Sequence, residues 1–217
     1  MAKPLVAIKN IFFDWDGTLA DSAALGLRAF QLAFEDLAFP FPLDIYEATY
    51  SPNWYATYEA LGLPKEQWEE ADRLWLSHYG EQTADLIQGV AETLLFFKSK
   101  DYRLGVVSSG SETRVCREID RSELRGCFDV IICNEQIVNK KPHPEGLDLA
   151  MQKLGSERAH SAYVGDAPED IQMGRQADVL TIGVRSLYPG SARLLNENPD
   201  IFVESLSELP RYFGMLS

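Results

Sequence analysis

The chain has 217 residues, of which 46% are hydrophobic, and carries a formal net charge of −13 at pH 7. This length and composition are typical of one globular domain, or of one domain with a smaller insertion. The acidic balance argues against a nucleic-acid-binding protein, which needs basic residues to neutralise phosphates. A small phosphorylated ligand remains compatible, because a single bound cation can dominate the field of a site.

Targeting and redox features are few. No stretch reaches the roughly 18 uncharged apolar residues of a membrane span, and Met1–Asn10 lacks the long apolar region of a signal peptide. We therefore expect a cytoplasmic protein without a membrane partner. The cysteines include no Cys-x-x-Cys pair and predict reduced thiols in or near the core; they are Cys116, Cys127 and Cys133.

Short apolar runs alternate with segments of helical spacing along most of the chain. The runs expected to form buried strands are 8–15, 102–109, 128–133, 161–165, 178–184 and 200–203. The expected helices between them are 90–100, 145–155, which ends at the stop signal Gly155, and 169–177. This order predicts an α/β fold with a doubly wound, Rossmann-like parallel sheet.

One region breaks the alternation. Residues 23–88 are mostly helical in pattern, dense in aromatic residues and without a strand run. We expect a small all-helical cap domain, 21–87, inserted after the first strand into a core formed by 1–20 and 88–217. The linkers near Ala20 and Gln88 are the expected hinges. Spacing on one helix face favours packing over ligand stacking for Trp68, Trp75 and Tyr79, whereas Trp54 and Tyr55 are candidates to line a cleft between the domains.

Carboxylates follow the first and fourth strands of the predicted sheet. Asp14 and Asp16 lie two residues apart, so both side chains point the same way from an extended segment. Asp166 follows the fourth strand, and Asp170 lies near the start of the next helix. Ligands of open parallel sheets bind at the carboxyl ends of the strands, and oxygen-rich clusters suit Mg²⁺. A magnesium site is therefore expected at this edge.

Phosphoryl transfer fits the remaining polar groups. A carboxylate that attacks a phosphate needs cations and hydrogen-bond donors around the phosphoryl oxygens. The second strand ends at Ser108, whose hydroxyl is followed by the backbone amides of Ser109 and Gly110, and "KKPHPEG" supplies Lys140 and Lys141. Each feature alone is common in loops and turns. Their occurrence together and in order is improbable by chance.

These residues resemble the haloacid dehalogenase superfamily, in its phosphoglycolate-phosphatase-like and β-phosphoglucomutase-like branch with a helical cap. "DWDGTLADS" resembles the first motif of that family, and "LGVVSSG" resembles the second, which ends in Ser108. Lys141-Pro142-His143-Pro144 resembles the third, Lys-Pro-x-Pro, and "YVGDAPEDI" resembles the fourth. The resemblance covers nearly the whole chain.

The resemblance implies a role for each matching residue. Asp14 would be the nucleophile that forms an aspartyl-phosphate, and Asp16 would protonate the leaving alcohol, a task that a raised pKa favours. Ser108 and Lys141 would hold the phosphoryl group, with Lys140 as the alternative lysine. Mg²⁺ would be held by the Asp14 carboxylate, the Asp16 backbone carbonyl, Asp166 and, directly or through water, Asp170. Thr18, Ser109 and Gly110 are the further substrate-binding candidates.

The family match leaves the substrate open. We expect a phosphatase acting on a small-molecule phosphate monoester. A phosphosugar mutase shares every motif, whereas a dehalogenase would lack Asp16, and a non-catalytic binding module would not need the intact motif residues. Ser109 and Asp178 depart from the residues that the family usually has after the second and fourth motifs. Arg28 is a candidate for a substrate carboxylate or second phosphate.

Overall fold

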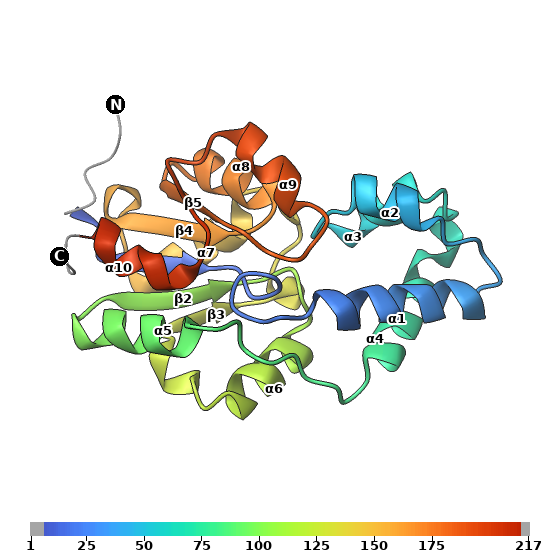
Figure 1. Ribbon diagram of the computed structural model, residues 1–217, viewed down its shortest axis with the longest axis horizontal. Coiled ribbons are helices and arrows are strands. Elements are labelled where there is room, and N and C mark those ends of the chain that lie inside the picture. The colour runs from blue at the N-terminus through green and yellow to red at the C-terminus, as the bar shows by residue number, and fades with distance from the viewer. Residues whose placement is uncertain (1–6, 214–217) are drawn as a thin grey trace.

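The computed structural model describes residues 7–213. Its core is a six-stranded, fully parallel sheet in the order β3-β2-β1-β4-β5-β6 (Figure 1). The strands are β1 (Asn10–Phe13), β2 (Arg103–Val107), β3 (Val130–Ile132), β4 (Ser161–Gly165), β5 (Leu180–Val184) and β6 (Ile201–Val203). All six fall within the predicted runs, and the α/β fold class is confirmed. Residues 1–6 and 214–217 lie outside the described residues. They include both ends of the predicted core, and residues 1–6 belong to the stretch examined for a signal peptide.

Helices cover both faces of this sheet. Those of the core are α5 (Val90–Ser99), α6 (Glu112–Arg121), α7 (Glu145–Leu154), α8 (Pro168–Gln176), α9 (Ser191–Leu194) and α10 (Leu209–Tyr212). Short 3₁₀ turns join the elements at Arg125–Cys127, Asn134–Gln136, Arg158–His160, Leu195–Glu197 and Leu206–Glu208. The end of α7 at Gly155, which has φ 61°, agrees with the predicted stop.

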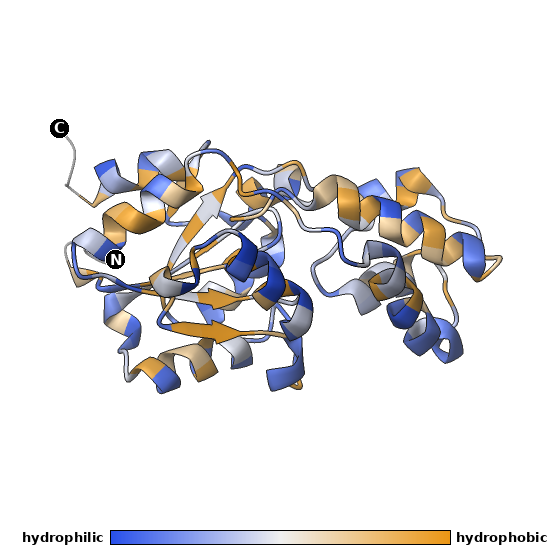
Figure 2. Cartoon of the chain, turned by 90° about the horizontal axis from the view of Figure 1, so that it is seen from below, coloured by the Kyte–Doolittle hydropathy of each residue, from blue (hydrophilic) through white to orange (hydrophobic). Residues whose placement is uncertain are grey.

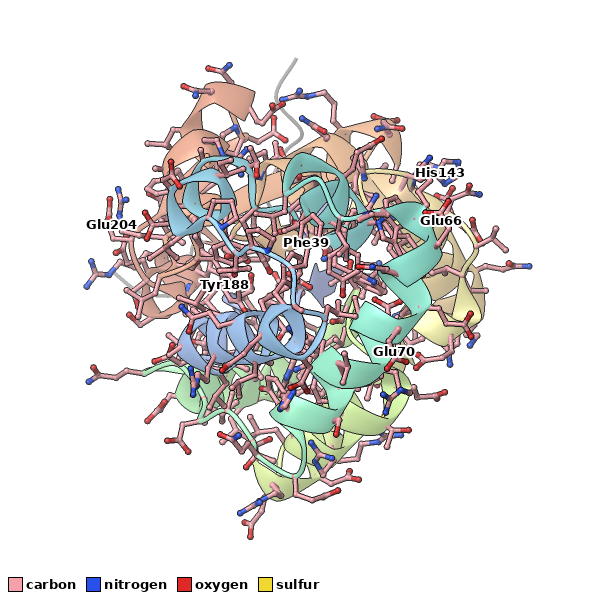
Figure 3. The ribbon with its side chains drawn as sticks, turned by 90° about the vertical axis from the view of Figure 1, so that its right-hand side faces the viewer. Phe39, Glu66, Glu70, His143, Tyr188 and Glu204 are labelled. Carbon is pink, nitrogen blue, oxygen red and sulfur yellow. The ribbon has the colours of Figure 1, made fainter. Side chains whose placement is uncertain are left out.

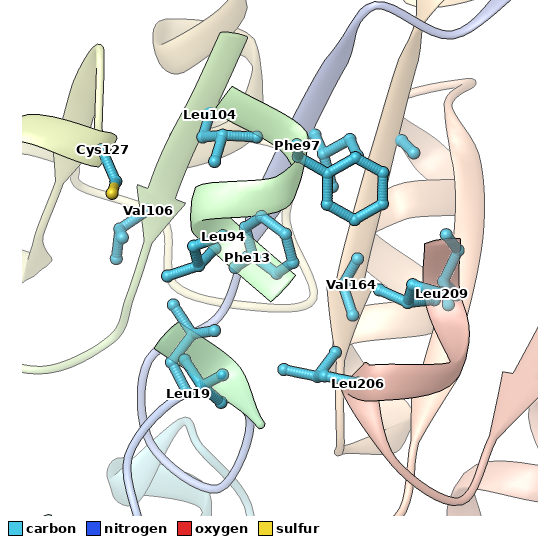
Figure 4. Packing of buried hydrophobic residues seen from close by; sticks show 14 of the residues in the cluster. Phe13, Leu19, Leu94, Phe97, Leu104, Val106, Cys127, Val164, Leu206 and Leu209 are labelled. Atoms are coloured by element: carbon cyan, nitrogen blue, oxygen red, sulfur yellow. The ribbon is translucent and has the colours of Figure 1, made fainter. Parts of the chain in front are cut away.

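Alternation along the central strand explains why both faces are buried. Phe13 packs on one face with Leu94 and Phe97 of α5 (Figure 4), whereas Phe12 packs on the other with Leu147 of α7. Successive side chains of a strand point to opposite faces. The strands are accordingly mostly apolar, and Figure 2 shows orange strand arrows within the core beside paler ones. Cys127 and Cys133 are buried and all three thiols are free, as predicted.

Four helices form a separate lobe beside the carboxyl edge of the sheet, at the right of Figure 1. They are α1 (Ala23–Asp36), α2 (Leu43–Thr49), α3 (Trp54–Ala60) and α4 (Trp68–Tyr79), with a 3₁₀ turn at Lys65–Gln67. Their aromatic core contains Phe30, Phe34, Tyr46 and Tyr58. The aromatic density noted in the sequence therefore serves packing first. Within 7–213, no helix is long and apolar enough to cross a membrane.

The two chain segments that join this lobe to the core lie side by side. Asp21 donates its backbone N–H to Asp85 (2.9 Å), and Ile87 donates to Leu19 (2.9 Å). Ala20 and Leu86 form an antiparallel bridge. The lobe is thus connected to the core by a paired, two-stranded neck close to the predicted hinge positions.

Candidate active site

Asp14 lies directly after β1 and is nearly fully buried (4% exposed). Its Oδ1 atom lies 2.7 Å from the Nζ atom of Lys141, and the same ammonium lies 2.8 Å from Oδ1 of Asp170. Three residues that are far apart in the sequence therefore meet at the carboxyl edge of the sheet. The Nζ atom of Lys140 lies instead 4.1 Å from the ring centroid of Trp54. Of the two candidate lysines, Lys141 is therefore the one that contacts Asp14.

Three carboxylates gather here. One oxygen from each of Asp14, Asp166 and Asp170 lies within 4.8 Å of the others, and all three residues are buried. Burial, followed by the charges of Asp170 and Asp16, raises the pKa of Asp14 to about 7 against the opposing effect of Lys141. Burial, followed by the charges of Asp170 and Asp14, raises the pKa of Asp166 well above its usual range. The cluster thus carries more negative charge than Lys141 balances.

Asp166 is held from two sides. Its Oδ1 accepts a hydrogen bond from the Thr18 hydroxyl (3.0 Å), and its Oδ2 accepts one from the Ser186 hydroxyl (2.5 Å). Gly17 runs beside it with φ +77°, and a Cβ at Gly17 would lie only 2.4 Å from Asp166 Oδ2. The turn after Asp16 therefore requires glycine. Thr18, a candidate to bind substrate, donates its hydroxyl to this carboxylate.

Asp170 is held by the start of α8. Its Oδ2 accepts the backbone N–H groups of Asp166 (3.1 Å) and Ala167 (3.0 Å), which are free at a helix N-terminus. Its Oδ1 faces Lys141 and accepts the Tyr163 hydroxyl (3.3 Å). Both oxygens are therefore already engaged, and Asp170 fixes the position of Lys141.

Asp16 lies beside this cluster and pairs with Arg114 of α6. The Nη1 and Nη2 atoms of Arg114 lie 2.9 and 2.5 Å from the two carboxylate oxygens, and Ser22 donates to Oδ1 (2.6 Å). Burial favours the neutral carboxyl, but Arg114 and Ser22 outweigh it, so the pKa of Asp16 is lowered. This direction is opposite to the raised pKa that favours a general acid at neutral pH.

Arg114 is itself part of a buried network that includes Glu118. Glu118 accepts hydrogen bonds from Arg114 Nη1 (3.0 Å), Trp15 Nε1 (2.6 Å) and the Tyr79 hydroxyl at the end of α4 (2.7 Å). Sequence reasoning missed Arg114, Glu118, Ser22 and Ser186. One signal was present for Arg114, since a basic residue in the first turn of a helix opposes the helix dipole.

The loop after β2 supplies polar groups. Ser108 is buried, and its Oγ accepts the backbone N–H of Gly110 (2.9 Å). The Oγ atom of Ser109 is buried and has no hydrogen-bond partner among the described residues. Ser109 and Gly110 line the cleft described next, and the hydroxyl of Ser109 is free to donate to a ligand there.

A cleft of about 180 Å³ lies between the core and the helical lobe. Asp14, Asp16 and Asp166 line its core side, and Trp54 and Trp75 line its lobe side. Its lining residues are Asp14, Asp16, Phe30, Tyr50, Ser51, Pro52, Trp54, Tyr58, Asp72, Trp75, Leu76, Ser109, Gly110, Ser111, Arg114, Asn134, Glu135, Asp166, Ala167 and Tyr188. Figure 3, seen from the lobe side, shows Tyr188 near the middle of the molecule, whereas His143 and Glu204 lie at its periphery.

Two other candidates lie away from this cleft. Arg28 is exposed on α1 and is not among the lining residues. Tyr55 stacks on Trp68 at a centroid distance of 5.0 Å and donates its hydroxyl to Asp72 (3.1 Å). Tyr55 thus contacts Asp72, which lines the cleft, but does not line the cleft itself. Of the predicted pair, Trp54 alone is a lining residue.

Comparison with known proteins identifies the class. Residues 11–184 match the family model of the haloacid dehalogenase-like hydrolases, and the chain belongs to this family. It is 32% identical to the "Probable phosphatase IndB" of Dickeya dadantii over 95% of this chain and 92% of that protein. It is 28% identical to "Pyrophosphatase PpaX" of Listeria monocytogenes over 93% and 94% of the two chains.

Solved structures share the fold. A haloacid dehalogenase-like hydrolase from Bacteroides fragilis superposes with a TM-score of 0.84 at 25% identity, over 93% of this chain and 99% of that one. A "predicted phosphoglycolate phosphatase" from Haemophilus somnus gives a TM-score of 0.81 at 21% identity, over 94% and 97%. The predicted family is confirmed, and the protein is a hydrolase of the phosphatase type.

Proposed function

We propose that this hydrolase is a Mg²⁺-dependent phosphatase that cleaves a small phosphate monoester through an aspartyl-phosphate on Asp14. The observation that carries the proposal is the position of Asp14. It faces the cleft, lies 2.7 Å from Lys141, and shares a cluster with Asp166 and Asp170. A buried carboxylate with an adjacent cation suits attack on an anionic ester, because the cation offsets the repulsion between nucleophile and phosphate.

The donor set fits Mg²⁺. The carboxylate oxygens of the cluster are hard ligands, and raised pKa values at Asp14 and Asp166 indicate an unbalanced negative charge that a cation would relieve. The Asp14 and Asp166 carboxylates and the Asp16 backbone carbonyl would hold the ion. Asp170, whose oxygens are engaged with Lys141 and the start of α8, would act through water. The ion would supply charge stabilisation to the phosphoryl oxygens.

The reaction would proceed in two displacements. A carboxylate oxygen of Asp14 attacks phosphorus, the bond from phosphorus to the leaving oxygen breaks, and Asp16 gives a proton to that oxygen. In the second step Asp16 takes a proton from water, which attacks phosphorus and releases Asp14. Lys141, the hydroxyls of Ser108 and Ser109 and the amide of Gly110 would hold the phosphoryl oxygens.

Asp16 would need to leave its pair with Arg114 to reach the leaving group. The lowered pKa favours the ionised form of Asp16 while the pair persists. We infer that residues 21–87 act as a cap whose movement about the paired neck accompanies this change, since Tyr79 of α4 joins Arg114 through Glu118. Closure of a cap also excludes water from the first displacement.

The test is phosphate release from 4-nitrophenyl phosphate and a panel of metabolite monoesters. We expect turnover with Mg²⁺, none with chelator, and a loss of roughly 10³-fold or more in Asp14→Asn. Asp44→Asn, which removes an exposed carboxylate from α2, is the matched control and should retain activity. Full turnover in Asp14→Asn would contradict the assignment. Isomerisation of a sugar phosphate without phosphate release would favour the mutase alternative.

A further inference from the structure

The two sides of the cleft differ in chemistry. The core side presents the carboxylates of the phosphoryl site, whereas the cap side is formed largely by the aromatic residues Phe30, Trp54, Tyr58 and Trp75. One carboxylate, Asp72 of α4, interrupts this aromatic wall. If the phosphoryl group lies at Asp14, the leaving group must lie against the cap side. The chemistry of that wall therefore decides which leaving group is accepted.

Asp72 is held in place by two phenols. Its Oδ1 accepts the Tyr58 hydroxyl (3.0 Å), and its Oδ2 accepts the Tyr55 hydroxyl (3.1 Å). Burial raises the pKa of Asp72, while hydrogen bonds from Tyr58, Tyr55 and Trp54 and the charge of Lys140 oppose the rise. A carboxylate can accept about four hydrogen bonds, so Asp72 keeps the capacity to accept one from a ligand. Asp72 is thus a fixed acceptor that would gain from a cation or donor.

Positive charge on the cleft wall is already paired. Among the described residues, Arg114 is the one basic side chain that lines the cleft, and its two terminal nitrogens bind Asp16 and Glu118. Lys140, which attracts Asp72, lies over the ring of Trp54 and binds Asn134, and it lines a second hollow with Lys141 and His143. Arg28 is exposed and outside the cleft.

A second anionic group on the substrate would therefore meet Asp72, while the one basic residue among the described lining residues, Arg114, is already paired. We propose that this cleft selects phosphate monoesters whose leaving alcohol is apolar or aromatic in body and carries a cationic or hydrogen-bond-donating group, and that Asp72 rejects leaving groups with a second negative charge. This inference rests on the proposed function. It predicts that pyrophosphate and sugar bisphosphates are poor substrates, although relatives at 28% identity are named pyrophosphatases.

Three aryl phosphates that differ chiefly in the charge of a para substituent test this directly. They are 4-(2-aminoethyl)phenyl, 4-ethylphenyl and 4-(2-carboxyethyl)phenyl phosphate, which have similar leaving groups and size. We expect kcat/KM to fall in that order, by about tenfold or more between the ammonium and carboxylate members, because one like-charge contact near a protein surface has this effect. Pyrophosphate should be slower than 4-ethylphenyl phosphate.

Asp72→Asn keeps the shape of the side chain and removes its charge. We expect the ammonium-to-carboxylate ratio of kcat/KM to fall towards one in this variant, and to stay at the wild-type value in Asp44→Asn. Thermal unfolding checks that both variants fold. Because the readout is a ratio within one protein, a general loss of activity does not mimic it.

The outcomes separate the inference from the proposed function. Turnover of all three esters at similar kcat/KM, faster turnover of the carboxylate member, or an unchanged ratio in Asp72→Asn would overturn the inference and leave the phosphatase intact. Rapid pyrophosphate hydrolysis would also overturn it. No Mg²⁺-dependent turnover of any ester would refute the proposed function, and the inference with it.

Discussion

Arg114 and Asp16 form a two-point ion pair, in which Nη1–Oδ1 and Nη2–Oδ2 are 2.9 and 2.5 Å apart. The pair joins α6 to the turn that follows β1, across 98 residues of sequence. Arg114 is 5% exposed and the Asp16 side chain 21% exposed, so water screens the pair only in part. Two-point contacts between guanidinium and carboxylate are among the stronger hydrogen-bonded pairs in proteins. The proposed acid is therefore restrained in this structure.

Replacing Arg114 should change the pH dependence of turnover. Arg114 lowers the pKa of Asp16, whereas burial raises it. Without the guanidinium, the pKa of Asp16 therefore rises, and its acid form persists to higher pH. For Arg114→Gln we expect the alkaline fall in kcat/KM, which reports the free enzyme, to move to higher pH with an alkyl phosphate. With 4-nitrophenyl phosphate, whose leaving group needs little protonation, the profile should move less.

Two further variants complete that experiment. Arg114→Lys keeps a cation and should shift the alkaline limb less than Arg114→Gln, while Arg121→Gln, at an exposed position of the same helix, should leave it unchanged. Loss of the arginine leaves Asp16 and Glu118 without their cation and should lower stability by about 3 kcal/mol. The profiles are therefore recorded below the unfolding temperature. An alkaline limb that moves to lower pH would contradict the role of Asp16 as acid.

The neighbouring lysines should differ sharply in their effect on turnover. Lys141 contacts Asp14 and Asp170, whereas Lys140 lies over Trp54. Removing a cation that stabilises the phosphoryl oxygens costs about 10²–10³ in kcat. We expect a loss of this size in Lys141→Met and less than about a tenfold loss in Lys140→Met. The reverse order, measured with 4-nitrophenyl phosphate, would exchange the roles of the two residues.

Magnesium should stabilise the folded chain through Asp166. A ligand at about 100 times its Kd adds about 2.7 kcal/mol to the free energy of unfolding, which thermal unfolding detects without an activity assay. Asp166→Asn should lose most of the Mg²⁺-induced rise in Tm. Its Tm without metal should not fall below that of wild type by much, because the substitution also relieves like-charge repulsion with Asp14 and Asp170.

The control for magnesium is Asp44→Asn, whose rise in Tm with Mg²⁺ should equal that of wild type. An equal Mg²⁺ response in Asp166→Asn would place the ion elsewhere.

Two helices end in the same backbone geometry but with different residues, so substitutions at these two ends can be compared for their effect on the free energy of unfolding. Ala38, after α1, has φ 50°, and Gly155, after α7, has φ 61°. In both, the next residue donates its N–H back into the last turn, from Phe39 to Phe34 and from Ser156 to Met151. A left-handed conformation costs a non-glycine residue about 1 kcal/mol.

Ala38→Gly should therefore raise the free energy of unfolding by up to about 1 kcal/mol, and Gly155→Ala should lower it by about the same amount. No atom lies within 4 Å of a Cβ built at Gly155, so the penalty there comes from the backbone alone. Denaturant titration measures both changes. Equal effects of the same sign would show that the strain argument is wrong for these ends.

The strands of the sheet, and the convergence of the motif residues at one of its edges, could be predicted from the sequence alone. Each apolar run, from Asn10–Phe13 to Ile201–Val203, contains a strand. A parallel strand that is buried on both faces is recognisable from its own continuous hydrophobic sequence. Asp14, Ser108 and Asp166 then had to converge, since parallel strands end at one edge. The helical insertion was equally readable, as its aromatic residues had helical spacing and no strand pattern.

The contacts of the side chains around that edge could not be predicted, because they depend on how elements distant in the sequence pack together. Thr18 donates to Asp166, Arg114 pairs with Asp16, and Asp72 of α4 lines the cleft. Helical period tells which side of a helix is apolar, but not which residue of another element meets it across a cleft. These contacts depend on how the four-helix lobe packs against the core. A shift of a few ångströms there decides whether a side chain can contact a ligand or only another side chain.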